Sequence, residues 1–384
     1  MQTPPADERI DSRGRSFAAA ALAFAVVMLG TTLPTPLYAI YSEQLGFGVL
    51  TTTVIFAIYA AGVIFALIVF GRWSDVVGRR PLLLVGALLS AVSAVVFLTA
   101  GPVWQLMVGR ILSGLSAGIY AGAATAAVIE LAPPRWQGRA PAIATAANIG
   151  GLGMGPLIAG LLAQFAPAPL RLPFALDLVL LVGVLVGIWF ITEPVDVRAD
   201  ARLSLQRLSV PAEVRGVFLR AAIAAFAGFA VMGTFTGVTP SFVSQVLGIS
   251  SHAVAGLLVA VLFLTSALTQ IVGRSQPTER SLIVGCAILV VGMAVLVVGL
   301  LVASLVLLFI GAIISGVGQG LSFSKGLAAV VAAAPTNRRA EVTSTYRRPG
   351  SRTRRSRTAR WVGNDRRSGS MPRSKTAPPP GGRR

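Results

Sequence analysis

Few charged side chains lie inside the long apolar stretches of the sequence, and four of them are the residues best placed to do chemistry. Arg110 and Glu130 share one stretch, Asp177 lies in a later one and Lys325 in the last. A charge inside an apolar segment of membrane length is costly unless it is paired or solvated, so such residues mark proton or anion handling. Arginine does not titrate near neutral pH, and its expected role is to lower the pKa of a nearby acid or to hold an anion. We therefore take Arg110, Asp177 and Lys325 as candidates for proton coupling or substrate binding.

Each candidate also has a plainer structural interpretation. Arg110 lies less than two turns from the start of its segment, so its side chain could simply extend to the membrane surface. Asp177 would either pair with Arg110 or act alone as a protonatable site. Lys325 would meet an anionic substrate or extend to the other surface. Glu130, near the end of its segment, is expected to cap or join helices rather than to couple protons.

The chain offers little for catalysis or metal binding. It has one histidine, His252, and one cysteine, Cys286, so no disulfide can form within it and a His/Cys metal site is not expected. No nucleophile–base pair and no phosphate-binding loop are visible. We expect no enzymatic activity and no cofactor, and ATP is not expected to supply energy.

Composition indicates the elements that must position these residues. The 384 residues are 54% hydrophobic and only 12% charged, about half the charged fraction of a soluble domain. Apolar segments of membrane length predict an all-α, multi-pass membrane protein whose first partner is the lipid bilayer. A polar linker, 192–216, divides six segments from four. The expected segments are 17–41, 50–70, 82–100, 103–132, 141–165, 172–191, 217–238, 253–272, 281–300 and 303–333.

A short basic loop joins the second and third segments and reads Gly71-Arg72-Trp73-Ser74-Asp75-Val76-Val77-Gly78-Arg79-Arg80-Pro81. Gly71 is expected to end one helix in a left-handed cap, Gly78 to permit a sharp turn, and Pro81 to lie in the first turn of the next helix. An ordinary basic membrane loop would need only arginines. The pattern Gly-x-x-x-Asp-x-x-Gly-Arg-Arg resembles the loop between helices 2 and 3 of the major facilitator superfamily of transporters.

The resemblance implies a mechanism in which two helical halves rock around a site at the membrane midplane. It implies that Gly71, Arg72, Asp75, Gly78, Arg79 and Arg80 form a conformational latch, in which Asp75 meets the start of an eleventh helix. Arg110, followed by Gly114, resembles a second motif of the family, in which the arginine is associated with proton transfer in proton-coupled members. The cavity would be lined by the first, fourth, seventh and tenth helices, with polar contacts from Tyr38, Thr234 and Gln319.

The first and fifth segments carry helix-modifying residues. Pro34 and Pro36 predict either a simple kink or a bent, polar, cavity-facing helix. The fifth segment contains Gly151, Gly155, Pro156 and Gly160, which resemble the helix-5 motif of drug–proton antiporters. Its glycines would let a neighbouring helix approach closely and its proline would bend the helix. The alternative is a generic interface of small residues.

An internal repeat supports two related halves. Gly71-Arg72 recurs as Gly273-Arg274, an offset of 202 residues. The glycines Gly109, Gly114 and Gly118 recur at the same offset as Gly311, Gly316 and Gly320. A shared offset at two separate places is better evidence than glycine-rich helices alone.

Orientation follows from the arginines and lysines. They gather in alternate loops, at 1–16, 71–81, 133–140, 192–216, 273–280 and from 335 onward, whereas the other loops hold only Arg171. The positive-inside rule therefore predicts a cytoplasmic N-terminus, and we expect a plasma-membrane location.

The repeat fails after about residue 346. Residues 347–384 hold twelve Arg and one Lys against one Asp, so most of the net charge of +19 lies there. The stretch is too polar to span a membrane and has the composition of disorder. Three explanations stay open, namely a tail that binds anionic lipid, a nucleic-acid-binding arm, and a shift of reading frame near codon 347, which we favour. Two apolar spans encoded in another frame would support the frame shift.

Together these observations predict a major facilitator fold with six helices in the first half and about four in the second. The expected organisation is a tail at 1–16, halves at 17–191 and 217–346, the linker between them, and the basic tail at 347–384. The expected activity is proton-driven efflux of a small hydrophobic compound by a monomer that has no specific nucleic-acid partner. The alternatives are a sugar or metabolite facilitator of the same fold and a truncated membrane protein that does not transport.

Overall fold

The computed structural model describes residues 6–71, 73–194, 215–237, 242–243, 247–249 and 251–333, and within these ranges every regular element is a helix. The first group of helices is α1 (Ala6–Thr32), α2 (Tyr38–Leu45), α3 (Val49–Phe70), α4 (Trp73–Val76), α5 (Arg79–Leu98), α6 (Val103–Leu131), η1 (Pro134–Trp136), α7 (Ala140–Thr145), η2 (Ala146–Gly150), α8 (Gly151–Phe165) and α9 (Leu172–Trp189). The second group is α10 (Arg215–Gly237), α12 (His252–Val272), η4 (Gly273–Ser275), α13 (Thr278–Leu301) and α14 (Leu305–Ala333).

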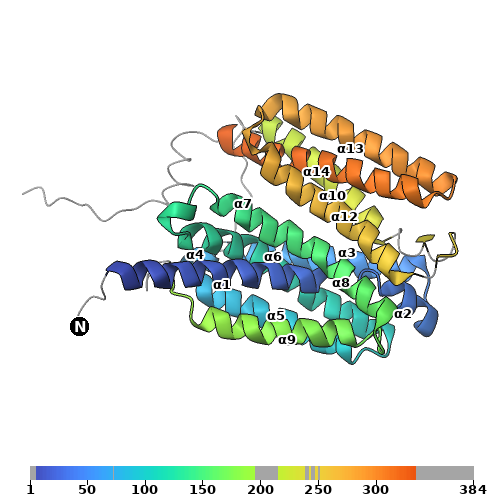
Figure 1. Ribbon diagram of the computed structural model, residues 1–384, viewed down its shortest axis with the longest axis horizontal. Helices are drawn as coiled ribbons and strands as arrows, with labels where there is room; N and C mark the ends of the chain where they lie inside the picture. Colours follow the sequence, from blue (N-terminus) through green and yellow to red (C-terminus); the bar gives the residue numbers. More distant parts are fainter. Residues whose placement is uncertain are drawn as a thin grey trace, which may run out of the picture.

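The long helices run side by side in two bundles (Figure 1). The first bundle contains α1, α3, α5, α6, α8 and α9, and the second contains α10, α12, α13 and α14. Helix α8 packs on α1 within its own bundle and on α12 of the other, so it joins the two. Ten helical segments of the described chain are long and apolar enough to cross a membrane, with α7, η2 and α8 forming one continuous crossing. The predicted division into six helices and about four is confirmed.

Large apolar side chains cover the outside of both bundles. Phe226 is 77% exposed, Val179 69% and Val290 69%. In water such a surface would aggregate, whereas in a bilayer it contacts lipid chains that are equally apolar. The bundle interiors are instead rich in alanine, glycine and serine, which let helices approach closely.

The sequence repeat has a structural counterpart in the packing of α6 and α14. Side chains at Gly114 and Gly118 would collide with α3, at Tyr59 and Val63 respectively. Gly316 and Gly320 lie against α12 in the same way. A Cβ at Gly316 would lie 2.6 Å from the carbonyl oxygen of Leu262, and a Cβ at Gly320 would lie 2.5 Å from that of Ser266. Both bundles therefore seat their fourth helix against their second through a pair of glycines.

The first crossing differs from its prediction at both ends. Helix α1 already begins at Ala6, so most of the expected polar tail is helical, and it ends at Thr32. Residues 33–37 form turns before α2 begins at Tyr38. Pro34 and Pro36 explain this break because neither can donate a backbone hydrogen bond to the preceding turn.

Several predictions concern residues outside the described ranges. These are Arg72, most of the linker 192–216, and the whole of the basic stretch 347–384 with the residues that precede it from 334. The side chain of Asp75 also lies outside the description, although its backbone belongs to α4.

Candidate functional site

Arg110 is held inside the first bundle by α1, α2 and α3. It lies on α6, which starts after Pro102, and its side chain is 1% exposed. Its Nε donates to the hydroxyl of Tyr38, and its Nη1 donates to the carbonyl of Thr31 at 2.6 Å. Its second terminal nitrogen, Nη2, has no hydrogen-bond partner among the described residues. The guanidinium therefore lies inside the bundle rather than at the surface that the plainer interpretation predicted.

Three aromatic rings surround this guanidinium. Its central carbon lies 5.2 Å from the ring centroid of Tyr38 and 5.3 Å from those of Phe56 and Tyr59. Aromatic faces attract cations, and most strongly where water is excluded. The rings supply no negative charge, so the arginine keeps its capacity to bind an anion.

The break after α1 supplies the carbonyl that Arg110 uses. In an uninterrupted helix the carbonyl of Thr31 would accept from the N–H of Thr35. Here Thr35 donates instead to Thr32 at 3.0 Å. The carbonyl of Thr31 is thereby free for Arg110, and the two prolines have a direct consequence for the site.

Asp177 lies on α9 and contacts the same stretch of α1. Its side chain is 2% exposed, and its Oδ1 has no hydrogen-bond partner among the described residues. It occupies space that Gly30 leaves, because a Cβ at Gly30 would lie 2.7 Å from Oδ2. The predicted pairing with Arg110 does not form. The two residues contact successive positions of α1 instead, Asp177 at Gly30 and Arg110 at Thr31.

Lys325 lies in the second bundle, whereas Arg110 and Asp177 lie in the first. It lies on α14, and its Nζ donates to the carbonyls of Arg274 and Gln276, at 3.1 and 2.7 Å. These carbonyls belong to the turn between α12 and α13. The contacts account for the burial of the lysine, and they favour the interpretation in which it extends toward the membrane surface.

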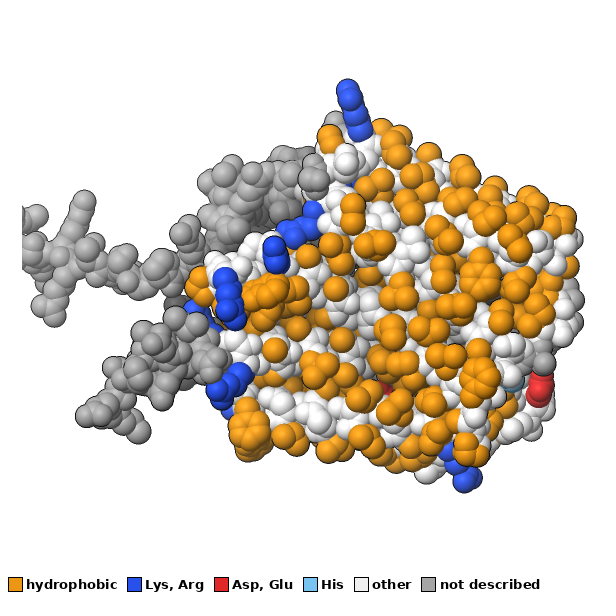
Figure 2. Space-filling model, in the orientation of Figure 1, with side chains coloured by type: hydrophobic (Ala, Val, Ile, Leu, Met, Phe, Trp, Pro, Cys, Tyr) orange, Lys and Arg blue, Asp and Glu red, His pale blue; other side chains and the backbone are white. Residues whose placement is uncertain are grey.

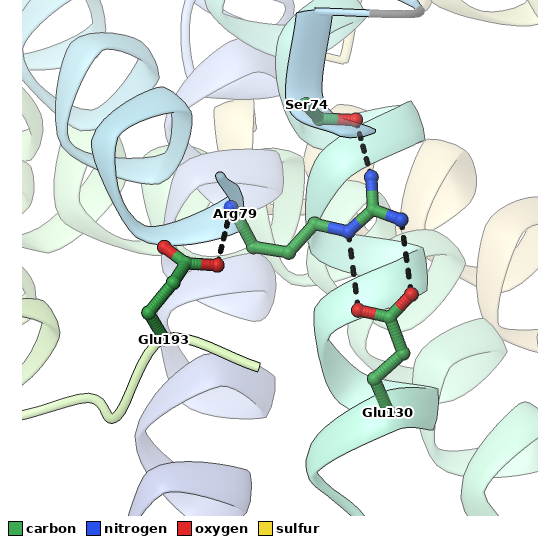
Figure 3. Close-up of polar contacts among 4 residues, drawn as sticks. All are labelled: Ser74, Arg79, Glu130 and Glu193. Atoms are coloured by element: carbon green, nitrogen blue, oxygen red, sulfur yellow. Dashed lines mark hydrogen bonds and ion pairs between the residues drawn. The ribbon is translucent and has the colours of Figure 1, made fainter. Parts of the chain in front are cut away.

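The loop at 71–80 is fastened by an arginine and two acids (Figure 3). Arg79 donates from Nε and Nη2 to the carboxylate of Glu130 on α6, at 3.1 and 2.9 Å, and from Nη1 to Ser74 at 2.5 Å. The backbone N–H groups of Arg79 and Arg80 donate to the carboxylate of Glu193, at 2.8 and 2.9 Å. This position of Glu193 satisfies two N–H groups of the first turn of α5, which have no partner within the helix. Glu130 thus joins helices, as expected.

The glycines of this loop behave differently from each other. The left-handed cap predicted at Gly71 is wrong, because Gly71 is right-handed (φ −55°) and the chain continues into the short helix α4. Gly78 does make the sharp turn, with φ +108°, directly before α5. A Cβ at Gly78 would also lie 2.7 Å from Oε2 of Glu193. Pro81 lies in the first turn of α5, as expected.

The motif of the fifth crossing forms two distinct contacts. Gly151 and Gly155 face α1, where a Cβ at Gly151 would lie 2.5 Å from the carbonyl of Ala25. Gly160 faces α12, where a Cβ would lie 2.5 Å from the carbonyl of His252 and 3.1 Å from Cα of Gly256. The motif is therefore a packing interface both within one bundle and between the two.

Pro156 adds a hydrogen bond between helices. Because proline has no N–H, the carbonyl of Leu152 lacks its usual partner one turn later. The hydroxyl of Thr32 donates to that carbonyl at 2.8 Å. Gly155 leaves the space in which this hydroxyl lies. A π-helical turn, η2, directly precedes α8 and was not predicted.

The remaining polar candidates lie in the second bundle. Gln319 is fully buried on α14 and shares a short hydrogen bond with Ser266, which also accepts from Gln270 at 3.2 Å. The Nε2 of Gln319 has no partner among the described residues. Thr234 donates to a carbonyl of its own helix, that of Ala230.

Sequence reasoning missed Glu193, Phe56 and Tyr59. Glu193 is an acid two residues after the predicted sixth span, and this position could have suggested a contact with the basic loops. Phe56 and Tyr59 are aromatic residues three positions apart in a largely aliphatic span, so they share a helix face. In the part of the chain described, no group of three His, Cys, Asp or Glu residues could hold a metal ion.

Comparison with known proteins identifies a family whose model this chain matches. Residues 20–347 match the model of the Major Facilitator Superfamily. The match ends where the arginine-rich stretch begins.

Two curated relatives illustrate the range of the similarity. The class D tetracycline resistance protein of Salmonella ordonez is 32% identical over 144 residues, which are 37% of this chain and 35% of that protein. Sugar transport protein 5 of Arabidopsis thaliana is 33% identical over 104 residues, which are 27% of this chain and 19% of that protein. The aligned part thus spans about a third or less of each relative's length.

A solved structure matches over more of the chain. It is a bacterial homologue of the human lysosomal transporter Spinster, in an inward-facing and unoccupied conformation. The TM-score is 0.59 at 16% identity, over 87% of this chain and 78% of that one. At this identity the likeness shows a common fold.

Proposed function

This chain belongs to the Major Facilitator Superfamily, a family of transporters, and from that premise we propose that it exports a small hydrophobic compound in exchange for protons. The single observation that carries the proton coupling is the unpaired carboxylate of Asp177, buried beside Gly30 in the first bundle. An isolated carboxylate in an apolar interior is far more stable protonated than charged. A group that gains a proton while buried and loses it when water reaches it can carry that proton across the cycle.

Arg110 is the second part of the proposal. It holds the carbonyl of Thr31, and Asp177 contacts the neighbouring residue Gly30. Loss of the proton from Asp177 would place a negative charge beside Gly30 of α1, while the fixed positive charge of Arg110 lies beside Thr31. The attraction between the two charges would act on α1 at the point where its backbone hydrogen bonds are already interrupted. Proton binding and the shape of α1 are thereby linked, and the proton gradient supplies the energy without a cofactor.

The proposed substrate is small and hydrophobic. The rings of Tyr38, Phe56 and Tyr59 around Arg110 would suit an aromatic compound, and a relative is named for resistance to tetracycline. We further propose a monomer in the plasma membrane with a cytoplasmic N-terminus. The arginines of the loops near 79, 135 and 274 support this orientation, since cytoplasmic loops carry an excess of positive charge. Neither catalysis nor a specific nucleic-acid partner forms part of the proposal.

The test uses the full chain in sealed vesicles, with tetracycline as the probe. Wild type should accumulate tetracycline under an imposed proton gradient, and a protonophore should abolish the accumulation. Asp177→Asn should remove gradient-driven accumulation while equilibrium binding of tetracycline is kept. Glu43→Gln, which neutralises an exposed acid at the end of α2, is the control and should transport normally. Full gradient-driven transport by Asp177→Asn would contradict the proposal.

A sugar or metabolite facilitator of the same fold is the second candidate, favoured by the similarity to a sugar transport protein. It predicts saturable glucose uptake that is indifferent to a protonophore. A third outcome, stable insertion without transport of any probe, would support the truncated, non-transporting protein considered above.

A further inference from the structure

A surface cavity lies at the end of the bundles that carries most of the described arginines. Its volume is about 470 Å³, and the described residues that line it are Arg135, Trp136 and Arg139. All three belong to the short connection between α6 and α7, just outside two membrane-spanning helices. Figure 2 shows blue side chains gathered mainly at this end of the molecule, next to the apolar belt.

The local fold keeps both guanidinium groups available. Pro134, Arg135 and Trp136 form a single 3₁₀ turn, and the N–H of Arg139 donates to the carbonyl of Trp136 at 2.8 Å. The guanidinium of Arg139 lies over the ring of Trp136, 5.6 Å from its centroid. Within the described chain, neither arginine side chain forms an ion pair or a hydrogen bond. This contrasts with Arg79 and Arg80, whose side chains are bonded to groups of the protein.

We propose that this cavity binds the phosphodiester head group of an anionic phospholipid. Two guanidinium groups offer several N–H donors to phosphate oxygens, and the planar fork of arginine matches phosphate geometry. The half-buried ring of Trp136 suits the boundary between head groups and acyl chains, where tryptophan is enriched. A head group in the membrane plane reaches this connection directly, since the helices on both sides of it enter the bilayer. Basic pockets at helix ends are suited to such head groups.

The cavity also lies beside a contact between the two bundles. Arg274, in the turn after α12, donates to the carbonyl of Gly138 at 3.5 Å. A lipid held by Arg135 and Arg139 would therefore border the place where the first bundle meets the second. The binding proposal does not depend on the substrate or on the coupling proposed above.

The experiment uses the full chain purified in a neutral detergent. Its unfolding temperature is followed while short-chain phosphatidylglycerol, short-chain phosphatidylcholine or inorganic phosphate is added. Phosphatidylglycerol should stabilise wild type and phosphatidylcholine should not. Arg135→Gln/Arg139→Gln should weaken the apparent affinity for phosphatidylglycerol about tenfold, since each arginine near a membrane surface contributes appreciably to binding anionic lipid.

The matched control is Arg171→Gln/Arg280→Gln, which removes the same charge from two exposed arginines outside the cavity. It should bind phosphatidylglycerol as wild type does. The arginine-rich stretch 347–384 is common to all variants, so its attraction for anionic lipid cancels in the comparison. An equal loss in the control would overturn the proposal, because binding would then follow overall charge. Equal stabilisation by inorganic phosphate would also overturn it, in favour of a soluble anion.

Discussion

The two bundles use the same helix packing but different chemistry to fasten the turn between their second and third helices. In the first, Arg79 and Glu130 form a two-pronged ion pair, and Glu193 holds the start of α5. In the second, Lys325 donates to two backbone carbonyls of the corresponding turn. In each bundle the fourth helix fastens the turn through one long side chain. Packing by glycine is thus the repeated property, and the polar fastening differs between the bundles.

The largest expected effect is that of Arg79→Ala. Removal of the Arg79 side chain leaves the carboxylate of Glu130 without this partner in a largely buried position. Breaking such a pair by deleting one member costs about 3 kcal/mol of unfolding free energy. Chemical unfolding of the full chain in lipid nanodiscs would measure the loss.

The control for that prediction is Arg80→Ala. The Arg80 side chain donates to the backbone carbonyl of Trp189 and lies over the Trp189 ring near the surface. Its loss should cost about 1 kcal/mol. Equal losses of unfolding free energy for Arg79→Ala and Arg80→Ala would mean that the buried ion pair stabilises the first bundle no more than the surface contacts of Arg80 do.

Gly78→Ala should destabilise the first bundle by about 2 kcal/mol, because a left-handed backbone is strained for alanine and the new Cβ would press on Glu193. Gly273→Ala, in the turn of the second bundle, should change the unfolding free energy by less than about 0.5 kcal/mol. Gly273 has φ −70°, and the nearest side-chain atom to its added Cβ is Leu321 Cδ1 at 3.3 Å. A similar loss at both glycines would remove the contrast between the turns.

Gly114→Ala and Gly316→Ala test the property that the bundles share. Each added Cβ would meet a backbone carbonyl of the neighbouring helix, that of Tyr59 or of Leu262. Overpacking of this kind costs about 1–3 kcal/mol, and we expect the two losses to agree within about 0.5 kcal/mol. Strongly unequal losses in the same unfolding measurement would break the packing equivalence.

A smaller effect than that of Arg79→Ala should follow Lys325→Met, which keeps the apolar stem and removes the donor. The carbonyls that Lys325 uses belong to exposed residues, so water can replace it, and the loss should be about 1 kcal/mol. Lys325→Arg should retain most of the stability. A loss as large as that of Arg79→Ala would show that the second turn depends on its charged partner as much as the first.

The sequence was sufficient to predict the helical architecture. Each crossing must satisfy its backbone internally and present apolar side chains to lipid, so both length and composition are constrained. The glycine repeat predicted two related halves, and the structure adds that Gly316 and Gly320 of this repeat permit close backbone contact with α12.

The site was predicted less completely, because contacts across helices depend on how each helix is rotated about its axis. Arg110 and Asp177 were both named as candidates, and one of the two alternatives for Asp177, pairing with Arg110, does not form because the two side chains contact α1 separately, at Gly30 and Thr31. The cap at Gly71 was mispredicted because the chain could continue into one more helical turn. Whether α1 would only kink or break fully depended on neighbours such as Arg110, which bonds the freed carbonyl of Thr31.

The crossing of α8 and α12 restricts how these two helices can evolve. Gly160 and Gly256 face each other, so a larger residue at either position cannot be offset by a smaller one at the other. The pair already has the least possible volume, and compensating substitutions within it are excluded. In descendants of this sequence that keep the crossing, we expect both positions to stay glycine even while the residues around a substrate diverge.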